Sequence, residues 1–194
     1  DGKRTAEALR MLPRVSADWQ ALAKARMALR GDKTGASALI ETVSATLKAD
    51  PGLAYERFLW RMRRENYPDA VVLLLERSDS PAALGRPELW AERRALLARW
   101  LMRKGEVRDA YRVAASHQMI GGDGFVGLEF LAGFIALRKL NDPDTALHHF
   151  AALKAAVQTP ISLSRADYWT GRAMQAKGDA AGADAAYQAA AQHQ

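Results

Sequence analysis

The 194-residue chain contains no cysteine. This absence excludes disulfide bridges, thiolate metal sites and cysteine nucleophiles. The chain also lacks any run of about 18 consecutive apolar residues, the length that a membrane-spanning helix needs, so we expect no transmembrane segment. Valine, isoleucine and threonine are few beside alanine, the most common residue. Because alanine loses no side-chain entropy in a helix whereas β-branched residues do, this balance predicts an all-α protein.

Charge is unevenly distributed along the chain. Lys and Arg together number 28 against 22 Asp and Glu, which gives a net charge of +6. Residues 1–104 hold 20 of the basic residues but only 13 of the acidic ones. A basic half suits an acidic partner, although a solvated arginine-rich surface that keeps the protein soluble explains the same surplus. The chain has no recognised nucleic-acid-binding motif, so we expect no nucleic-acid partner.

A short pattern recurs at intervals typical of helical repeats. In each copy a glycine or asparagine is followed by an alanine, and usually by a bulky apolar residue one helical turn later, as in Gly178, Ala183 and Tyr187. The five alanines of the pattern are Ala36, Ala70, Ala110, Ala146 and Ala183. Their spacings of 34, 40, 36 and 37 residues are typical of helix–turn–helix repeats.

Each copy of the pattern predicts a helical hairpin. The glycine or asparagine ends the first helix in the left-handed conformation, and an aspartate that follows it, as at Asp32, Asp142 and Asp179, caps the second helix. The alanine lets the two helices approach closely, and the bulky residue fills the space between them. The residues expected to end the first helices are Gly31, Asn66, Gly105, Asn141 and Gly178. The small residues found 12 or 13 positions before a repeat alanine are Ala98, Gly133 and Gly171.

A single hairpin cannot bury its apolar face alone, so we expect five of them to stack. The predicted fold is all-α: a right-handed α-superhelix, or solenoid, of TPR-like helical hairpins that forms one domain over residues 1–194. Segments containing proline or glycine at 78–88, 121–124 and 158–160 are expected to be loops between the repeats.

No catalytic or metal-binding constellation is recognisable in the sequence. His148 and His149 are adjacent, and neighbouring helical positions point about 100° apart, so we expect a surface pair rather than a metal site. The glycines at 121–124 lack the lysine of a phosphate-binding loop. Glu129 is interpreted as an isolated, solvated helix residue. We therefore expect no catalytic residue, no metal and no cofactor.

Two groups of arginines are the candidate ligand-binding residues, and they lie on helices about one repeat apart. Because equivalent faces of neighbouring repeats align in a solenoid, we expect the two groups to form one basic patch that binds carboxylates, phosphates or an acidic protein face. Salt bridges between repeats are the alternative. The candidate residues are Arg57, Arg61, Arg64, Arg93, Arg94, Arg99 and Arg103. The nearby tryptophans, for which we favour core packing over stacking on sugars or bases, are Trp60, Trp90 and Trp100.

The last part of the chain carries a more specific pattern. Residues 129–138 precede residues 142–143 and the segment 146–150, and residues 159–162 then lead to the segment 165–173. This succession resembles the superhelical, U-shaped domain of soluble lytic murein transglycosylases. The resemblance implies an α-helical scaffold that belongs to a larger enzyme.

The resemblance extends over residues 88–194, whereas over residues 1–87 only the repeat rhythm supports it. In that family a separate lysozyme-like domain cleaves the MurNAc–GlcNAc bond of peptidoglycan and leaves a 1,6-anhydro product, using a glutamate near a Glu-Ser motif. No Glu-Ser dipeptide occurs in this chain, so the catalytic domain is expected to lie outside it.

The function implied by the resemblance is that of a scaffold in peptidoglycan (murein) cleavage and turnover, which positions the glycan strand and the catalytic domain. Its expected partners are glycan strands with acidic peptide stems and that catalytic domain. The expected location is the periplasm, with the signal peptide outside a chain that opens on the polar residues 1–4. The alternative is a TPR-like adaptor that binds a protein segment in its concave groove.

Overall fold

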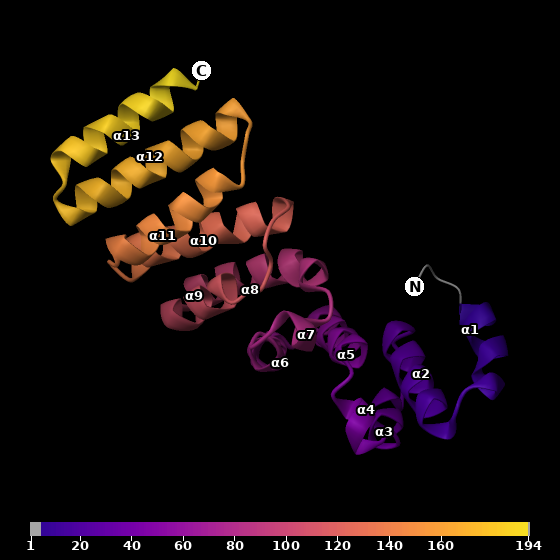
Figure 1. The fold of residues 1–194 in the computed structure, drawn as a ribbon. Helices are drawn as coiled ribbons and strands as arrows, with labels where there is room; N and C mark the ends of the chain where they lie inside the picture. The colour runs from indigo at the N-terminus through magenta and orange to yellow at the C-terminus, as the bar shows by residue number, and fades with distance from the viewer. Residues whose placement is uncertain (1–4, 194) are drawn as a thin grey trace. The chain divides into compact units, whose positions relative to one another are not determined.

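The computed structural model describes residues 5–193, and these residues form helices without any strand (Figure 1). The predicted all-α class is therefore confirmed. The chain divides into two compact units, Asp1–Arg86 and Pro87–Gln194. The single domain over residues 1–194 remains a prediction. The polar opening segment, residues 1–4, lies outside the described residues.

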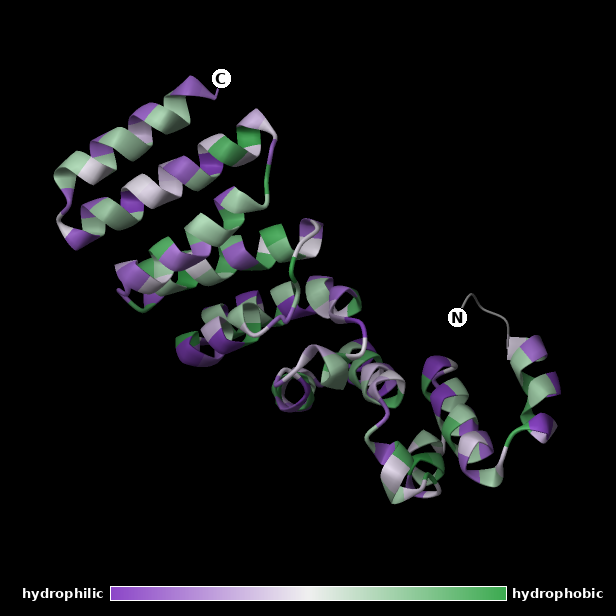
Figure 2. Cartoon of the chain, in the orientation of Figure 1, coloured by the Kyte–Doolittle hydropathy of each residue, from purple (hydrophilic) through white to green (hydrophobic). Residues whose placement is uncertain are grey.

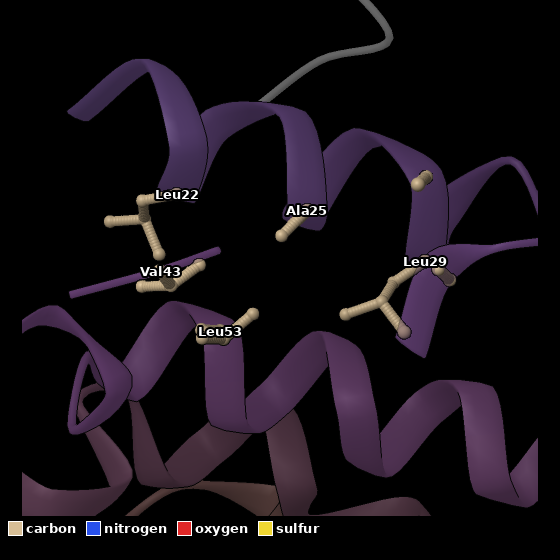
Figure 3. Close-up of a cluster of buried hydrophobic side chains, with 7 residues drawn as sticks. Leu22, Ala25, Leu29, Val43 and Leu53 are labelled. Atoms are coloured by element: carbon tan, nitrogen blue, oxygen red, sulfur yellow. The ribbon is translucent and has the colours of Figure 1, made fainter. Parts of the chain in front are cut away.

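The first unit contains two longer helices, α2 (Ala17–Arg30) and α5 (Pro51–Arg63), which pack against each other. Leu22, Ala25 and Leu29 of α2 are buried together with Val43 and with Leu53 of α5 (Figure 3). These apolar contacts form the core of the unit. The shorter elements of the unit are α1 (Thr5–Met11), the 3₁₀ helix η1 (Leu12–Arg14), α3 (Ala36–Glu41), α4 (Ala45–Lys48), α6 (Tyr67–Arg77) and α7 (Pro81–Leu84).

Helix α7 occupies part of the segment 78–88, which the sequence predicts to be a loop. The Ser80 hydroxyl caps this helix by accepting a hydrogen bond from the Ala83 N–H over 3.2 Å. Pro81 is the first helical residue, a position that suits its fixed φ and missing N–H. The loop prediction is therefore wrong over these four residues, because serine followed by proline begins a helix here.

The second unit is built from three pairs of consecutive helices, α8 with α9, α10 with α11, and α12 with α13 (Figure 1). Helix α9 also contacts α10, and α11 contacts α12, so successive pairs lie side by side. The elements of the unit are the 3₁₀ helix η2 (Pro87–Trp90), α8 (Ala91–Lys104), α9 (Val107–Ala115), α10 (Asp123–Lys139), α11 (Pro143–Ala155), α12 (Pro160–Lys177) and α13 (Ala180–Gln192).

The repeat alanines are all buried, each with at most 3% of its surface exposed. In two of the repeats the bulky residue that follows the alanine packs against a glycine of the partner helix. A Cβ atom on Gly133 would lie 2.5 Å from the Phe150 ring, and one on Gly171 would lie 2.6 Å from the Tyr187 ring. The predicted close approach within these two hairpins is therefore confirmed, and glycine supplies the space for each ring.

The left-handed turns fall where the sequence predicts them in three of the five repeats. Gly105, Asn141 and Gly178 have positive φ, and Asp142 and Asp179 cap the next helices through hydrogen bonds from backbone N–H groups. In the first two repeats the left-handed residues are Asp32 and Glu65, one position away from the predicted Gly31 and Asn66. Asp32 is therefore part of the turn itself, and the predicted cap at this position is wrong.

Two further loop predictions are only partly correct, because α10 begins at Asp123 and α12 begins at Pro160. Gly124 accordingly lies in the first turn of a helix, where its small size matters: a Cβ atom there would lie 2.8 Å from Ala91. Along the helices of both units, hydrophilic residues interrupt the hydrophobic ones (Figure 2). Among residues 5–193, no helix is both long enough and apolar enough to cross a membrane.

Candidate ligand-binding cleft

Two of the predicted basic residues of the first unit, Arg61 and Arg64, contact neighbours in that unit. Arg61 donates a hydrogen bond to the Asp69 carbonyl over 2.8 Å. Arg64 forms an ion pair with Asp32 at 3.1 Å, and its guanidinium lies 4.4 Å from the centre of the Trp60 ring. Burial is the main cause that lowers the pKa of Arg57, which is half-buried on α5. These contacts favour structural roles for Arg61 and Arg64.

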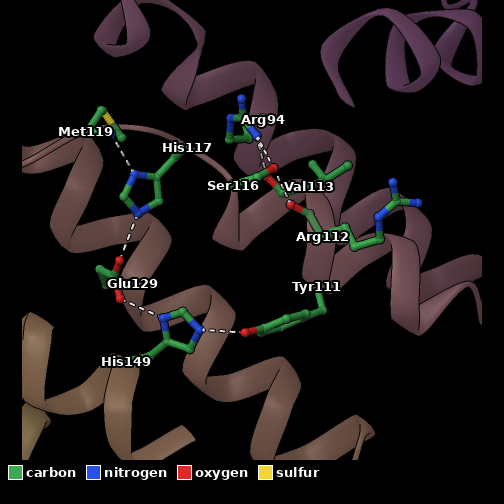
Figure 4. Close-up of polar contacts among 9 residues, drawn as sticks. All are labelled: Arg94, Tyr111, Arg112, Val113, Ser116, His117, Met119, Glu129 and His149. Carbon is green, nitrogen blue, oxygen red and sulfur yellow. Dashed lines mark hydrogen bonds and ion pairs between the residues drawn. The ribbon is translucent and has the colours of Figure 1, made fainter. Parts of the chain in front are cut away.

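Arg94 belongs to the core of the second unit rather than to a surface patch. Its side chain is fully buried and donates hydrogen bonds to the Val113 carbonyl over 2.8 Å and to the Ser116 hydroxyl over 3.3 Å (Figure 4). Burial lowers the pKa of Arg94 to about 10. The prediction that Arg94 belongs to a ligand-binding patch is therefore wrong, because its guanidinium forms hydrogen bonds that join α8 to the end of α9. Arg93 forms an ion pair with the exposed Glu92 at 2.6 Å.

Arg99 and Arg103 are the two predicted residues that line a cleft of the second unit. Both lie on α8, four residues apart and hence on one helix face. The cleft has a volume of about 590 Å³, and its other walls come from α8 and α10. Its remaining lining residues are Met102, Phe130, Leu131, Phe134 and Lys139.

The floor of the cleft consists of two aromatic rings, Phe130 and Phe134, and a third ring outside the lining packs against both. Phe130 and Phe134 are one turn apart on α10, and each makes an edge-to-face contact with Trp169 of α12, at centroid distances of 5.8 and 5.4 Å. The Arg165 guanidinium lies 5.3 Å from the centre of the Phe130 ring. Such ring packing fixes the orientation of the floor.

The rim of the cleft is positively charged and lacks counter-ions. Arg99, Arg103 and Lys139 form no ion pair or hydrogen bond within residues 5–193, and no acidic side chain lines the cleft. Unpaired cations beside an apolar surface suit a ligand that combines negative charge with an apolar group. The lining contains no histidine, serine, threonine, aspartate or glutamate.

A second polar group in this unit was not predicted from the sequence. Glu129 of α10 is buried, and both of its carboxylate oxygens accept hydrogen bonds: from His117 Nε2 over 2.9 Å and from His149 Nδ1 over 2.6 Å (Figure 4). The His149 Nε2 atom lies 2.9 Å from the Tyr111 hydroxyl. The Met119 N–H donates to His117 Nδ1 over 3.0 Å, which places the His117 proton on Nε2.

This Glu129 network, formed by Glu129, His117, His149 and Tyr111, corrects two predictions. Glu129 is not solvated and His149 is not on the surface, whereas His148 is exposed. Burial by itself raises the pKa of Glu129, but the hydrogen bonds from His117 and His149 outweigh it and hold the pKa at about 2. Burial, and then the charges of Asp142 and Glu129, raise the pKa of Tyr111.

The Glu129 network connects the loop after α9 with helices α9, α10 and α11. In the part of the chain that the structure describes, no three His, Asp or Glu residues are grouped so that they could hold a metal ion. One signal in the sequence pointed to the Glu129 network. Glu129 lies between Leu128 and Phe130 in an apolar stretch, where a carboxylate is buried and therefore needs partners.

Comparison with known proteins gives no family for this chain. The chain matches no protein-family model, and no curated protein or solved structure is detectably similar to it. The case for a function therefore depends on the cleft and on the sequence pattern.

Proposed function

We propose that this chain is a non-catalytic binding scaffold in peptidoglycan turnover, the superhelical domain of a soluble lytic transglycosylase in the periplasm. The helical hairpins, stacked as a right-handed α-superhelix of TPR-like units, hold an anionic polymer in place while a separate catalytic domain cleaves it. The resemblance of residues 88–194 to that family and the packing of consecutive helix pairs in the second unit support this proposal.

The observation that carries the proposal is the rim of the cleft between α8 and α10. Three cations, Arg99, Arg103 and Lys139, surround an open aromatic floor and have no protein carboxylate to pair with in the described part of the chain. The peptide stems of peptidoglycan carry free carboxylates, which are suitable partners for these side chains. Binding at an exposed site of this kind is weak and decreases as salt screens the charges.

Sedimentation of the purified chain with isolated peptidoglycan sacculi tests the proposal. We expect the chain to sediment with sacculi at low ionic strength and to be released at about 0.5 M salt, where the Debye length falls to roughly 4 Å. The Arg99→Ala/Arg103→Ala double variant should sediment less than the wild type. Arg108→Ala, which removes an exposed charge of α9 that does not line the cleft, is the matched control.

Two results would overturn this function. One is the absence of sedimentation with sacculi at low salt. The other is robust lysis of peptidoglycan by the chain alone in a zymogram, because the proposal gives the chain no catalytic group.

A further inference from the structure

The lining of the α8–α10 cleft is distinctive for the chemical groups that it omits. Arg99, Arg103 and Lys139 supply cations, and the other lining residues are apolar. No lining side chain has a hydroxyl, an amide or a carboxylate. A sugar hydroxyl both donates and accepts hydrogen bonds, whereas the arginines and the lysine of this lining can only donate. This lining therefore suits carboxylates attached to an apolar group better than it suits a glycan.

The positions of the cations favour more than one carboxylate. Arg99 and Arg103 follow each other along one face of α8, and Lys139 lies at the C-terminal end of α10. A guanidinium binds a carboxylate through two parallel hydrogen bonds, so two arginines one turn apart can hold two acidic groups of one chain. The lining has three cations and no acidic side chain. The negative charge that pairs with these cations must therefore be supplied by the ligand.

The floor adds a requirement for an apolar group. Phe130 and Phe134 are only partly buried although Trp169 packs against both of them. Met102 of α8 and Leu131 of α10 continue this apolar surface beside the two rings. A branched or aromatic side chain placed on the floor removes this surface from water, which stabilises the complex.

We propose that the α8–α10 cleft is a binding site for an acidic peptide, in which a bulky apolar side chain contacts Phe130 and Phe134 and neighbouring carboxylates pair with Arg99, Arg103 and Lys139. The inference rests on the proposed binding function of the chain and narrows its ligand to a peptide. The sugar part of the polymer contributes no contact in the cleft.

NMR of the whole chain, labelled with ¹³C at its methionine methyl groups, tests the site directly. The chain has six methionines, and Met102 is the one that lines the cleft. The probe is the synthetic peptide acetyl-Leu-Glu-Glu-Ala with a free carboxyl terminus. We expect its addition to shift the Met102 signal, assigned with Met102→Leu, while the Met27 signal of the first unit stays in place.

Two altered peptides test the charged contacts and the apolar contact separately, and three variants of the chain test the cations. Replacing both glutamates of the peptide by glutamine, or its leucine by serine, should each weaken binding by about tenfold, because each change removes one class of contact. Arg99→Ala and Arg103→Ala should each weaken binding about threefold to tenfold. Arg108→Ala should leave the affinity unchanged.

The possible failures are distinguishable from those of the proposed function. Binding of the peptide at Met102 without sedimentation on sacculi would retain the acidic-peptide site and overturn the peptidoglycan role. Sedimentation on sacculi that survives in Arg99→Ala/Arg103→Ala, together with an unmoved Met102 signal, would overturn the site. Binding of vesicles of anionic phospholipid in place of the peptide would overturn it as well.

Discussion

At the scale of single residues, Glu129 illustrates how a buried charge is stabilised. Both carboxylate oxygens accept hydrogen bonds from histidine N–H groups, and the side chain is almost removed from solvent. Each histidine is held in turn, His117 by the Met119 N–H and His149 by the Tyr111 hydroxyl. Satisfied networks of this kind specify one arrangement of their helices, whereas a partly satisfied network is costly.

Replacing Glu129 by glutamine tests the weight of the Glu129 network. The amide retains one acceptor, but its NH₂ group then faces a histidine N–H donor, so one buried donor loses its partner. We expect Glu129→Gln to lower the free energy of unfolding by about 2–4 kcal/mol, as measured by urea denaturation. Glu92→Gln, at a carboxylate whose side chain is 85% exposed, is the control and should change stability by less than about 0.5 kcal/mol. Equal effects of the two substitutions would contradict this role.

The difference in stability between the wild type and Glu129→Gln should depend on pH, and the pKa of Glu129 gives the direction of this dependence. The pKa of Glu129 is about 2 in the folded protein, below the ordinary value of 4.5, so its ionised form favours folding. This contribution, about 3 kcal/mol, is complete above pH 4.5 and is lost as the pH falls toward 2. The difference in stability between wild type and Glu129→Gln should therefore shrink over this interval, and a difference that grew on acidification would contradict the assignment.

The residues of this network also mark what sequence can and cannot predict at this scale. A buried Glu129 was foreseeable from its apolar neighbours in the chain. Its two histidine partners were not, because they lie 12 residues before it and 20 residues after it, on a loop and on another helix. Arg94 was misassigned for a similar reason: its acceptors, Val113 and Ser116, become neighbours only when α8 and α9 pack.

At the scale of elements, the hairpins follow from short-range patterns. The spacing of the repeat alanines predicts which helices meet, because a small residue at the contact lets two helices approach closely, and these alanines are buried. The exact turn residue is less predictable. Glycine and asparagine are the residues that most often adopt the left-handed conformation at a helix end, which favours Gly31 and Asn66. The residues that adopt it are instead their neighbours Asp32 and Glu65. Whether the hairpins continue into a superhelix depends on packing between repeats, which local patterns do not encode.

The contact between α10 and α11 should depend on the lack of a side chain at Gly133. An added methyl group would lie 2.5 Å from the Phe150 ring, so Gly133→Ala forces the two helices apart or rotates the ring. We expect a loss of about 1–3 kcal/mol in the free energy of unfolding, measured by urea denaturation. Gly127→Ala is the matched control on the same helix, since a Cβ atom there meets nothing within 4 Å. That control should be neutral or stabilise the protein by up to about 1 kcal/mol; a neutral Gly133→Ala would show that Phe150 does not depend on this space.

At the scale of the whole molecule, the features with a proposed function gather in one of the two units. The α8–α10 cleft and the Glu129 network lie wholly within Pro87–Gln194. The cleft was only partly predictable: the sequence identified Arg99 and Arg103 as ligand-binding candidates. The sequence did not associate these arginines with Phe130 and Phe134, which belong to the next helix pair in the chain. The two rings lie beside the arginines because α10 packs against α8.

This distribution predicts that residues 87–194 fold and bind without the first unit. The unit has its own buried cluster around Phe150, with Ala146, Leu153 and Ala166, and its helices pair consecutively from α8 to α13. We expect the fragment 87–194 to unfold cooperatively in a thermal scan followed by circular dichroism, because a compact domain of about 100 residues usually does so. It should also bind the acidic peptide with the affinity of the full chain and show the same Met102 shift.

Two outcomes would contradict this independence of the second unit. A fragment that lacks a cooperative transition would show that the second unit requires the first in order to fold. A folded fragment that fails to bind the peptide would assign part of the peptide site to residues before Pro87.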